Sequence, residues 1–185
     1  MAATVLRASL NPGETLGDRI MKVDHAGEHG AVCIYRAQRW FARWTAPDMV
    51  AELDAFLTHE QRHRARFGEE LARRGRRRCR SYLFCGLGGF VLGGVTGLFG
   101  RRPIAATTVA IETVVLRHMR EQIDQLSDED QAAADALRDI QDEQEHHALS
   151  QARPAPPGIW PRLIDPVVGA STELVIWCGM RFRFL

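Results

Sequence analysis

Two pairs of residues in this sequence place a glutamate three positions before a histidine, Glu60-x-x-His63 and Glu143-x-x-His146. On a helix, positions i and i+3 project from the same face, so each pair can direct a carboxylate and an imidazole at one metal ion. One such pair arises easily by chance, and it carries little weight alone. The repetition of the pattern is what points to a metal site.

Each pair is preceded by one further glutamate at nearly the same distance, Glu28 before the first and Glu112 before the second. These glutamates fall on or beside the apolar stripes of predicted helices, where a carboxylate is costly to bury unless it is paired or binds a cation. Carboxylates with only two imidazoles suit iron or manganese better than structural zinc. They form the ligand set of carboxylate di-iron and di-manganese helical bundles. The candidate ligands are Glu28, Glu60, His63, Glu112, Glu143 and His146.

The letters His59-Glu60-Gln61-Arg62-His63 also match H-E-x-x-H, the signature of zinc metalloproteases. A zinc protease would use both histidines as ligands and Glu60 as general base, and it would need a third ligand. It would also leave the other glutamates of the set unexplained. The di-metal interpretation uses all of them and leaves only His59 over, so we expect His59 to be a bystander.

The remaining histidines admit more than one role. His25 and His29 flank Glu28 and could orient it, or serve as local surface or capping residues. His118 lies six positions after Glu112, away from the predicted metal face, where a hydrogen bond to a ligand is still within reach. His147 is the alternative to its neighbour His146 as a ligand.

Helical periodicity runs through the chain, and no alternating β-branched run of useful length appears. Asp128 to Asp130 after Ser127 favour a helix N-terminus there, with Ser127 as N-cap. The proline-rich stretch 153–161 predicts a linker that no helix crosses. The predicted helices span 15–44, 47–74, a segment following Pro103, 127–151 and an apolar segment at 167–178. This pattern predicts an all-α, ferritin-like four-helix bundle with an additional apolar helical segment and a C-terminal helix.

Length and composition fit one domain spanning residues 1–185, with residues 1–14 as a frayed lead-in. The net charge of +1 predicts no nucleic-acid partner. Four cysteines without a C-x-x-C pair read as free thiols of a reducing compartment. The N-terminus lacks the apolar region of a secretory signal.

Residues 81–100 are uncharged and rich in glycine, and arginines flank them on both sides. Spacings such as Gly89-x-x-x-Gly93 and Gly93-x-x-x-Gly97 would let another helix approach closely. We expect an apolar hairpin or helix that lies against the bundle and in a membrane interface, with arginines of 73–102 on anionic headgroups. The alternative is an internal packed helix beside a solvated basic turn.

Five stretches carry a resemblance to a known family: "DRIMKVDHAGEHGAVCIYRAQ", "HEQRH", "GFVLGGVTGLFG", "TTVAIETVV" and "DEQEHH". In this order they resemble the demethoxyubiquinone hydroxylases of ubiquinone biosynthesis, ferritin-like di-iron monooxygenases peripheral to the inner membrane. The resemblance spans residues 17–184. The family usually has tyrosine where this chain has His29 and commonly an aromatic residue where it has Met119, so no role is carried over to these two positions.

The resemblance implies that the six candidate residues bind two iron ions, with Glu60 and Glu143 able to bridge. It implies O₂-dependent ring hydroxylation of a polyprenylated methoxy-methyl-benzoquinol, with electrons from the quinol itself or from NADH through it. It implies a place on the cytoplasmic face of a bacterial inner membrane, or on the matrix face in a mitochondrion. Partners would be the membrane, a second copy or other ubiquinone-biosynthesis proteins.

Other functions would use the same ligands. A ferroxidase or peroxide-reducing bundle would need neither the apolar segment nor the arginine cluster. A tRNA-modifying di-iron hydroxylase would need a continuous basic face, and a lipid carrier or assembly factor would tolerate loss of the ligands. Metal analysis separates a di-iron protein from a zinc protease.

Overall fold

Helices make up all the regular structure of the part of the chain that is described. The computed structural model describes residues 8–150 and 158–182, and for residues 145–150 the backbone alone. No strand occurs within these residues, which confirms the predicted all-α class. The elements are α1 (Leu16–Thr45), the 3₁₀ helix η1 (Pro47–Met49), α2 (Val50–Arg73), α3 (Tyr82–Leu98), α4 (Arg101–Leu126), α5 (Gln131–Ser150) and α6 (Ile159–Arg181).

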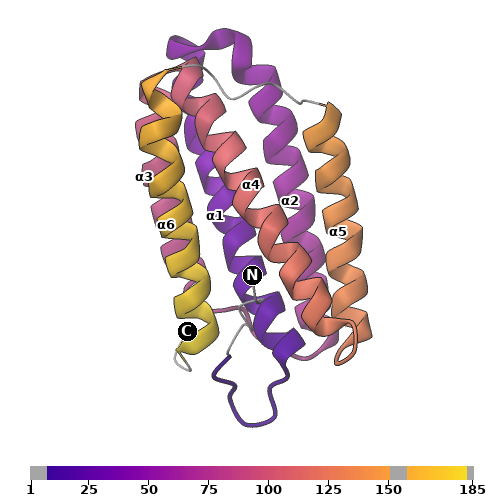
Figure 1. Cartoon of the computed structure of the whole chain (residues 1–185). Coiled ribbons are helices and arrows are strands. Elements are labelled where there is room, and N and C mark those ends of the chain that lie inside the picture. The colour runs from indigo at the N-terminus through magenta and orange to yellow at the C-terminus, as the bar shows by residue number, and fades with distance from the viewer. Residues whose placement is uncertain (1–7, 151–157, 183–185) are drawn as a thin grey trace.

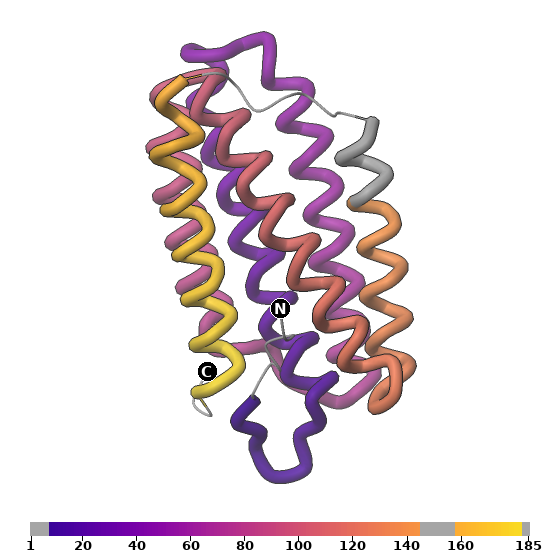
Figure 2. Tube along the Cα trace, in the orientation of Figure 1, coloured from indigo at the N-terminus to yellow at the C-terminus, as the bar shows by residue number. Residues whose placement is uncertain are grey.

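Four of the helices, α1, α2, α4 and α5, form the bundle, and the other two lie along one side of it (Figure 1). α3 packs on α1, and α6 packs on α4. α4 crosses the bundle diagonally from its start near α3 and α6 to its end beside α5 (Figure 2). The predicted bundle with an apolar helix and a C-terminal helix is therefore confirmed.

Local sequence signals explain where the first two helices begin. The side chain of Thr15 accepts a hydrogen bond from the backbone N–H of Asp18, and the Asp18 carboxylate accepts one from Thr15 in return. This capping box satisfies two N–H groups that a helix start leaves without partners. Pro47 opens η1, which leads directly into α2. Proline suits this position because it has no N–H to satisfy.

The predicted start of the fourth bundle helix at Ser127 was wrong. Ser127 instead ends α4, where its hydroxyl donates to the carbonyl of Ile123. Asp130 takes the expected capping role, because its carboxylate accepts the backbone N–H of Ala133 just inside α5. Both residues are good N-caps, and Arg74, the C-cap residue of α2, favours Asp130 through a two-point ion pair with its carboxylate.

The predicted linker at 153–161 was wrong at its end, because α6 begins at Ile159, and residues 153–157 of the linker lie outside the described residues. Pro161 falls in the first turn, where its missing N–H costs no helical hydrogen bond. Gly158 precedes the helix with a φ of 129°, a backbone conformation that side chains disfavour. The last helix therefore starts well before the predicted apolar segment at 167–178, and it contains Pro166 in its interior.

The apolar segment forms one helix, α3, and its glycines determine how closely it packs. The Cα of Gly89 faces the carbonyl of Gly30, and that of Gly93 faces the backbone of Ile34, so that a Cβ at either glycine would overlap α1. The predicted close approach of another helix is confirmed, and that helix is α1. The opposite face of α3 leaves large apolar side chains exposed: Leu83, Phe84, Leu87, Phe90, Val91, Val95 and Leu98.

Candidate metal centre

Three buried side chains from two neighbouring helices meet inside the bundle. Glu28 of α1 is 5% exposed, and Glu60 and His63 of α2 are 6% and 0% exposed. One ligand atom from each of the three residues lies within 4.8 Å of the others. The apolar periodicity of α2 continues through Leu53, Phe56 and Phe67, all buried, so both ligand positions of that helix face the core.

The two carboxyl groups of this cluster share a hydrogen bond. Burial raises the pKa of Glu28 well above its ordinary value, and the adjacent Glu60 carboxyl raises it further. Burial also raises the pKa of Glu60. Like charges in a dry interior cannot both ionise without a compensating cation, so this pair retains a proton or binds a metal ion. The donor set fits a divalent cation that prefers oxygen with some nitrogen, such as iron or manganese.

Glu112 of α4 belongs to the same electrostatic environment. Burial raises its pKa to about 7, and the charge of Glu60 contributes to the rise. Tyr35 of α1 is 1% exposed, and its pKa is raised well above the ordinary value by burial first and then by the carboxylates Glu60 and Glu112. The ligand atoms of Glu112 do not belong to either three-residue cluster of the described residues.

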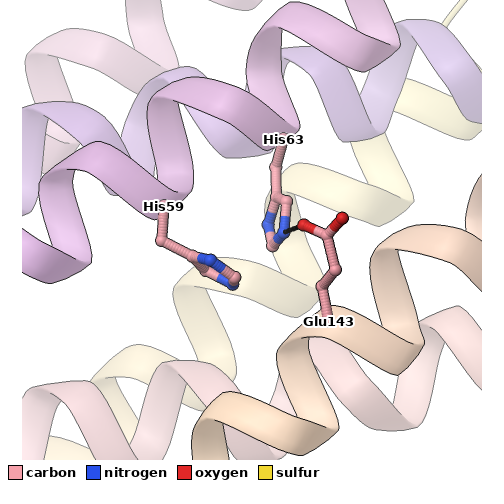
Figure 3. Close-up of side chains that lie close together, drawn as sticks. All are labelled: His59, His63 and Glu143. Atoms are coloured by element: carbon pink, nitrogen blue, oxygen red, sulfur yellow. Dashed lines mark ion pairs between the residues drawn. The ribbon is translucent and has the colours of Figure 1, made fainter.

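Glu143 of α5 reaches His63 from the other side of the bundle. Its Oε2 lies 3.6 Å from Nε2 of His63, the pair joined by a dashed line in Figure 3. The Glu143 side chain is 42% exposed, and its Oε1 accepts a hydrogen bond from Arg66 at 3.1 Å. This carboxylate therefore lies at the edge of the site, with one oxygen toward His63 and the other on a surface arginine.

His59, set aside as a bystander by sequence reasoning, lies inside this second cluster. Its side chain is buried, and its ring centroid lies 4.0 Å from that of His63. Ligand atoms of His59, His63 and Glu143 lie within 4.8 Å of one another, and Figure 3 shows the three side chains together. The signal that could have found it is the i, i+4 spacing to His63, which puts both rings on one face of α2.

The position of His146 is defined only by the backbone of α5. It lies three residues after Glu143, and its side chain, like that of His147, is outside the described residues. The choice between these two histidines as a ligand stays a prediction. Five of the six candidate ligands can be described: three form one cluster, Glu143 joins it through His63, and Glu112 interacts with Glu60 electrostatically.

A cavity of about 610 Å³ adjoins the cluster. It lies between α1, α3, α4 and α6, and Glu28 and Glu60 form part of its wall. Most of its lining is aliphatic, including Leu92 of α3, Ile111 of α4 and Val168 of α6. A cavity of this size and character accommodates a small organic ring with an apolar tail.

A family profile and individual relatives both match this sequence over nearly the whole chain. The profile of the family described as ubiquinone biosynthesis protein COQ7 matches residues 15–179. The chain belongs to the COQ7 family. A 3-demethoxyubiquinol 3-hydroxylase of Rhodospirillum rubrum is 32% identical over 167 residues, which cover 89% of this chain and 77% of the relative.

Two eukaryotic proteins match over the same share of the chain. A mitochondrial NADPH-dependent 3-demethoxyubiquinone 3-hydroxylase of Dictyostelium discoideum is 29% identical over 169 residues, with 89% of this chain and 76% of the relative covered. The human protein of the same name is 28% identical over 169 residues, with 89% and 77% covered.

His29 and His118 of this COQ7-family chain have partners outside the cluster of Glu28, Glu60 and His63. His29 stacks on Tyr82 of α3, with ring centroids 3.9 Å apart and an interplanar angle of 3°. His118 of α4 lies 3.1 Å from a carboxylate oxygen of Glu173 on α6, so it links these two helices. Met119 is 3% exposed and lines the cavity.

Proposed function

We propose that this chain is a di-iron monooxygenase that hydroxylates the ring of a polyprenylated demethoxyubiquinol in ubiquinone biosynthesis. The observation that carries the proposal is the buried cluster of Glu28, Glu60 and His63 in the wall of a largely aliphatic cavity. Membership of the COQ7 family supports the reaction, because the relatives are named for that hydroxylation.

Two iron ions would be held by Glu28, Glu60 and His63 together with Glu112, Glu143 and His146. Bound iron supplies the activation of O₂, which no side chain can perform. One oxygen atom of O₂ enters the ring and the other leaves as water, with two electrons and two protons from the reductant. The names of the eukaryotic relatives favour a reduced nicotinamide nucleotide as that reductant.

The protein's own contribution is a fixed arrangement of carboxylates beside a dry cavity. Glu28 and Glu60 come from the middle of two packed helices, so their positions are determined by the bundle and not by a loop. Aliphatic side chains around the cavity exclude water and contact the substrate ring and tail. A ferroxidase would need no such cavity.

The exposed apolar surfaces of α3 and α6 support a membrane-bound substrate. α6 is long and apolar enough to cross a membrane by length and composition, and α3 is a shorter apolar helix. Both lie on the same side of the bundle and border the cavity (Figure 1). We propose a peripheral attachment through this side, on the cytoplasmic face of a bacterial inner membrane, so that the prenyl tail enters from the bilayer.

A quinone profile of a strain lacking the gene tests the function. The deletion strain should accumulate the demethoxy intermediate, and the wild-type gene should restore the mature quinone. A gene carrying Glu60→Ala should not restore it, whereas Glu69→Ala, an exposed position on the same helix, should. Normal quinone content in the deletion strain would refute the proposal.

The cluster of His59, His63 and Glu143 favours a second candidate, a zinc hydrolase with Glu60 as general base. This arrangement supplies the third ligand that the H-E-x-x-H motif requires. It leaves the raised pKa of Glu28 and the buried Glu28–Glu60 pair without a use. Metal analysis of the purified protein distinguishes the two: two irons per chain support the hydroxylase, and one zinc supports the hydrolase.

A further inference from the structure

Two polar residues face each other across the cavity wall, in otherwise aliphatic surroundings. Asp24 of α1 and Gln122 of α4 both line the cavity. The side-chain amide of Gln122 donates a hydrogen bond to Oδ1 of Asp24 at 3.0 Å. Gln122 is 1% exposed and Asp24 is half-buried, so the hydrogen bond between them is largely shielded from solvent.

Each member of the pair keeps one oxygen atom for another partner. Oδ2 of Asp24 and Oε1 of Gln122 are buried and make no hydrogen bond with any residue that the structure describes. Oε1 of Gln144, which also lines the cavity and is 4% exposed, is in the same situation. Buried polar atoms are nearly always hydrogen-bonded, and each one left without a partner weakens the fold.

The chemistry of these atoms determines what they can bind. The hydrogen bond to the Asp24 carboxylate fixes the orientation of the Gln122 amide, because a carboxylate needs the NH₂ group as its donor. Burial raises the pKa of Asp24 to about 7, so above that pH its carboxylate is ionised and the remaining oxygen of each residue is an acceptor. A ligand that satisfies them must bring O–H or N–H donors into an aliphatic cavity. A quinol carries two hydroxyl donors, whereas a quinone carries only carbonyl acceptors.

We infer that Asp24 and Gln122 are positioning residues that bind a ring hydroxyl of the substrate and select its quinol form over its quinone form. The inference rests on the proposed function and adds residues and redox selectivity to it. Asp24 lies about one helical turn before Glu28 on α1. A hydroxyl bound at Asp24 would therefore hold the ring beside the buried carboxylates of the candidate metal centre.

The test measures the binding of one probe in two redox states. The probe is a methoxy-methyl-benzoquinol with a single prenyl unit, and its oxidised quinone is the comparison. Equilibrium dialysis against the purified full-length chain under argon gives a dissociation constant for each form without turnover. We expect the quinol to bind about tenfold more tightly, because its hydroxyl donates a hydrogen bond to a buried acceptor that the quinone leaves without one.

Two variants change the acceptors in different ways. Gln122→Met keeps the size of the side chain and removes its oxygen, so the preference for the quinol should fall severalfold. Asp24→Asn places an NH₂ donor where Oδ2 lies, so quinone binding should strengthen and the preference should reverse. Ser171→Ala is the matched control in the cavity, because the Ser171 hydroxyl already donates to the carbonyl of Val168. Its preference should equal that of the wild type.

Circular dichroism and thermal midpoints identify any variant that does not fold, and the conservative Asp24→Asn change keeps the test valid if Gln122→Met does not. Equal dissociation constants for quinol and quinone in the wild type would overturn the inference and leave the proposed function intact. A wild-type preference that persists in a folded Asp24→Asn or Gln122→Met variant would also overturn it. Failure of the wild type to bind either form would count against both the inference and the proposed function.

Discussion

Glu28 of α1 and Glu60 of α2 share a hydrogen bond between their buried carboxyl groups, and both form part of the wall of the aliphatic cavity. Two carboxyl groups held in contact away from water are unfavourable as two anions, and a shared cation makes the arrangement favourable. This relationship distinguishes the chain from an ordinary helical bundle, whose interior stripe would be apolar. It also makes the stability of the metal-free protein depend on pH.

The stability of the metal-free protein should fall as the pH rises from about 5 to 8. Glu112 titrates near 4.5 when unfolded and at about 7 when folded, so the folded state binds more protons across this interval and loses stability as they dissociate. Glu112→Gln should raise the free energy of unfolding at neutral pH by on the order of 1–3 kcal/mol. Urea unfolding in the presence of a chelator, at about pH 5 and about pH 8, measures the free energy of unfolding of the wild type and of Glu112→Gln. Equal pH dependence in the wild type and the variant would contradict it.

His59→Ala should leave two metal ions per chain and preserve hydroxylase activity, because the di-iron set does not require this imidazole. His63→Ala is the comparison on the same helix face and should lose metal. Metal content by mass spectrometry and hydroxylation of a short-tailed quinol measure both variants. If His59→Ala loses its metal as completely as His63→Ala, the zinc arrangement of His59, His63 and Glu143 is the correct one.

Sequence periodicity was sufficient to predict the bundle and the inward direction of Glu28, Glu60 and His63. These glutamates interrupt apolar stripes, and the cost of burying a charge makes such interruptions informative. The spatial proximity of His59 to Glu143 could not be predicted, because it depends on how α2 and α5 pack.

Helix starts and the cavity were less accessible to prediction. Ser127 and Asp130 are both suitable N-caps, and the ion pair of Asp130 with Arg74, just after α2, distinguishes them only in the folded protein. The sequence pattern places Pro161 in a linker, although the first turn of a helix tolerates proline. The cavity forms only when α3 and α6 pack beside α1 and α4, so no local signal encodes it.

Charge on the exposed face of α3 should weaken membrane binding. Phe90 is 55% exposed and Leu87 is 64% exposed. Transfer of such side chains into lipid is worth about 1.5–3 kcal/mol each, so Phe90→Glu should reduce binding to anionic lipid vesicles at least about tenfold. Gln131→Glu adds the same charge at an exposed position of α5 and should have little effect. Co-sedimentation measures both, and unchanged binding of Phe90→Glu would place the membrane contact elsewhere.

A side chain larger than hydrogen at Gly93 should separate α3 from α1. A Cβ at this position would overlap the backbone of Ile34, which cannot move without distorting α1. Gly93→Val should therefore lower the free energy of unfolding by about 1–3 kcal/mol or more. Gly88→Val is the control, because no atom lies within 4 Å of a Cβ there. Urea denaturation compares the two, and equal stabilities would show that α3 does not depend on this contact.

The most direct test of the central claim follows the oxygen atom. The iron-loaded chain is incubated with a short-tailed demethoxyubiquinol, a reductant and ¹⁸O₂, and the product is weighed by mass spectrometry. The account predicts a hydroxylated quinol that carries one ¹⁸O atom, formed by the wild type and by Glu69→Ala but not by Glu60→Ala. A wild-type protein that holds two irons per chain and returns the substrate unchanged, or that gives an unlabelled product, would contradict it.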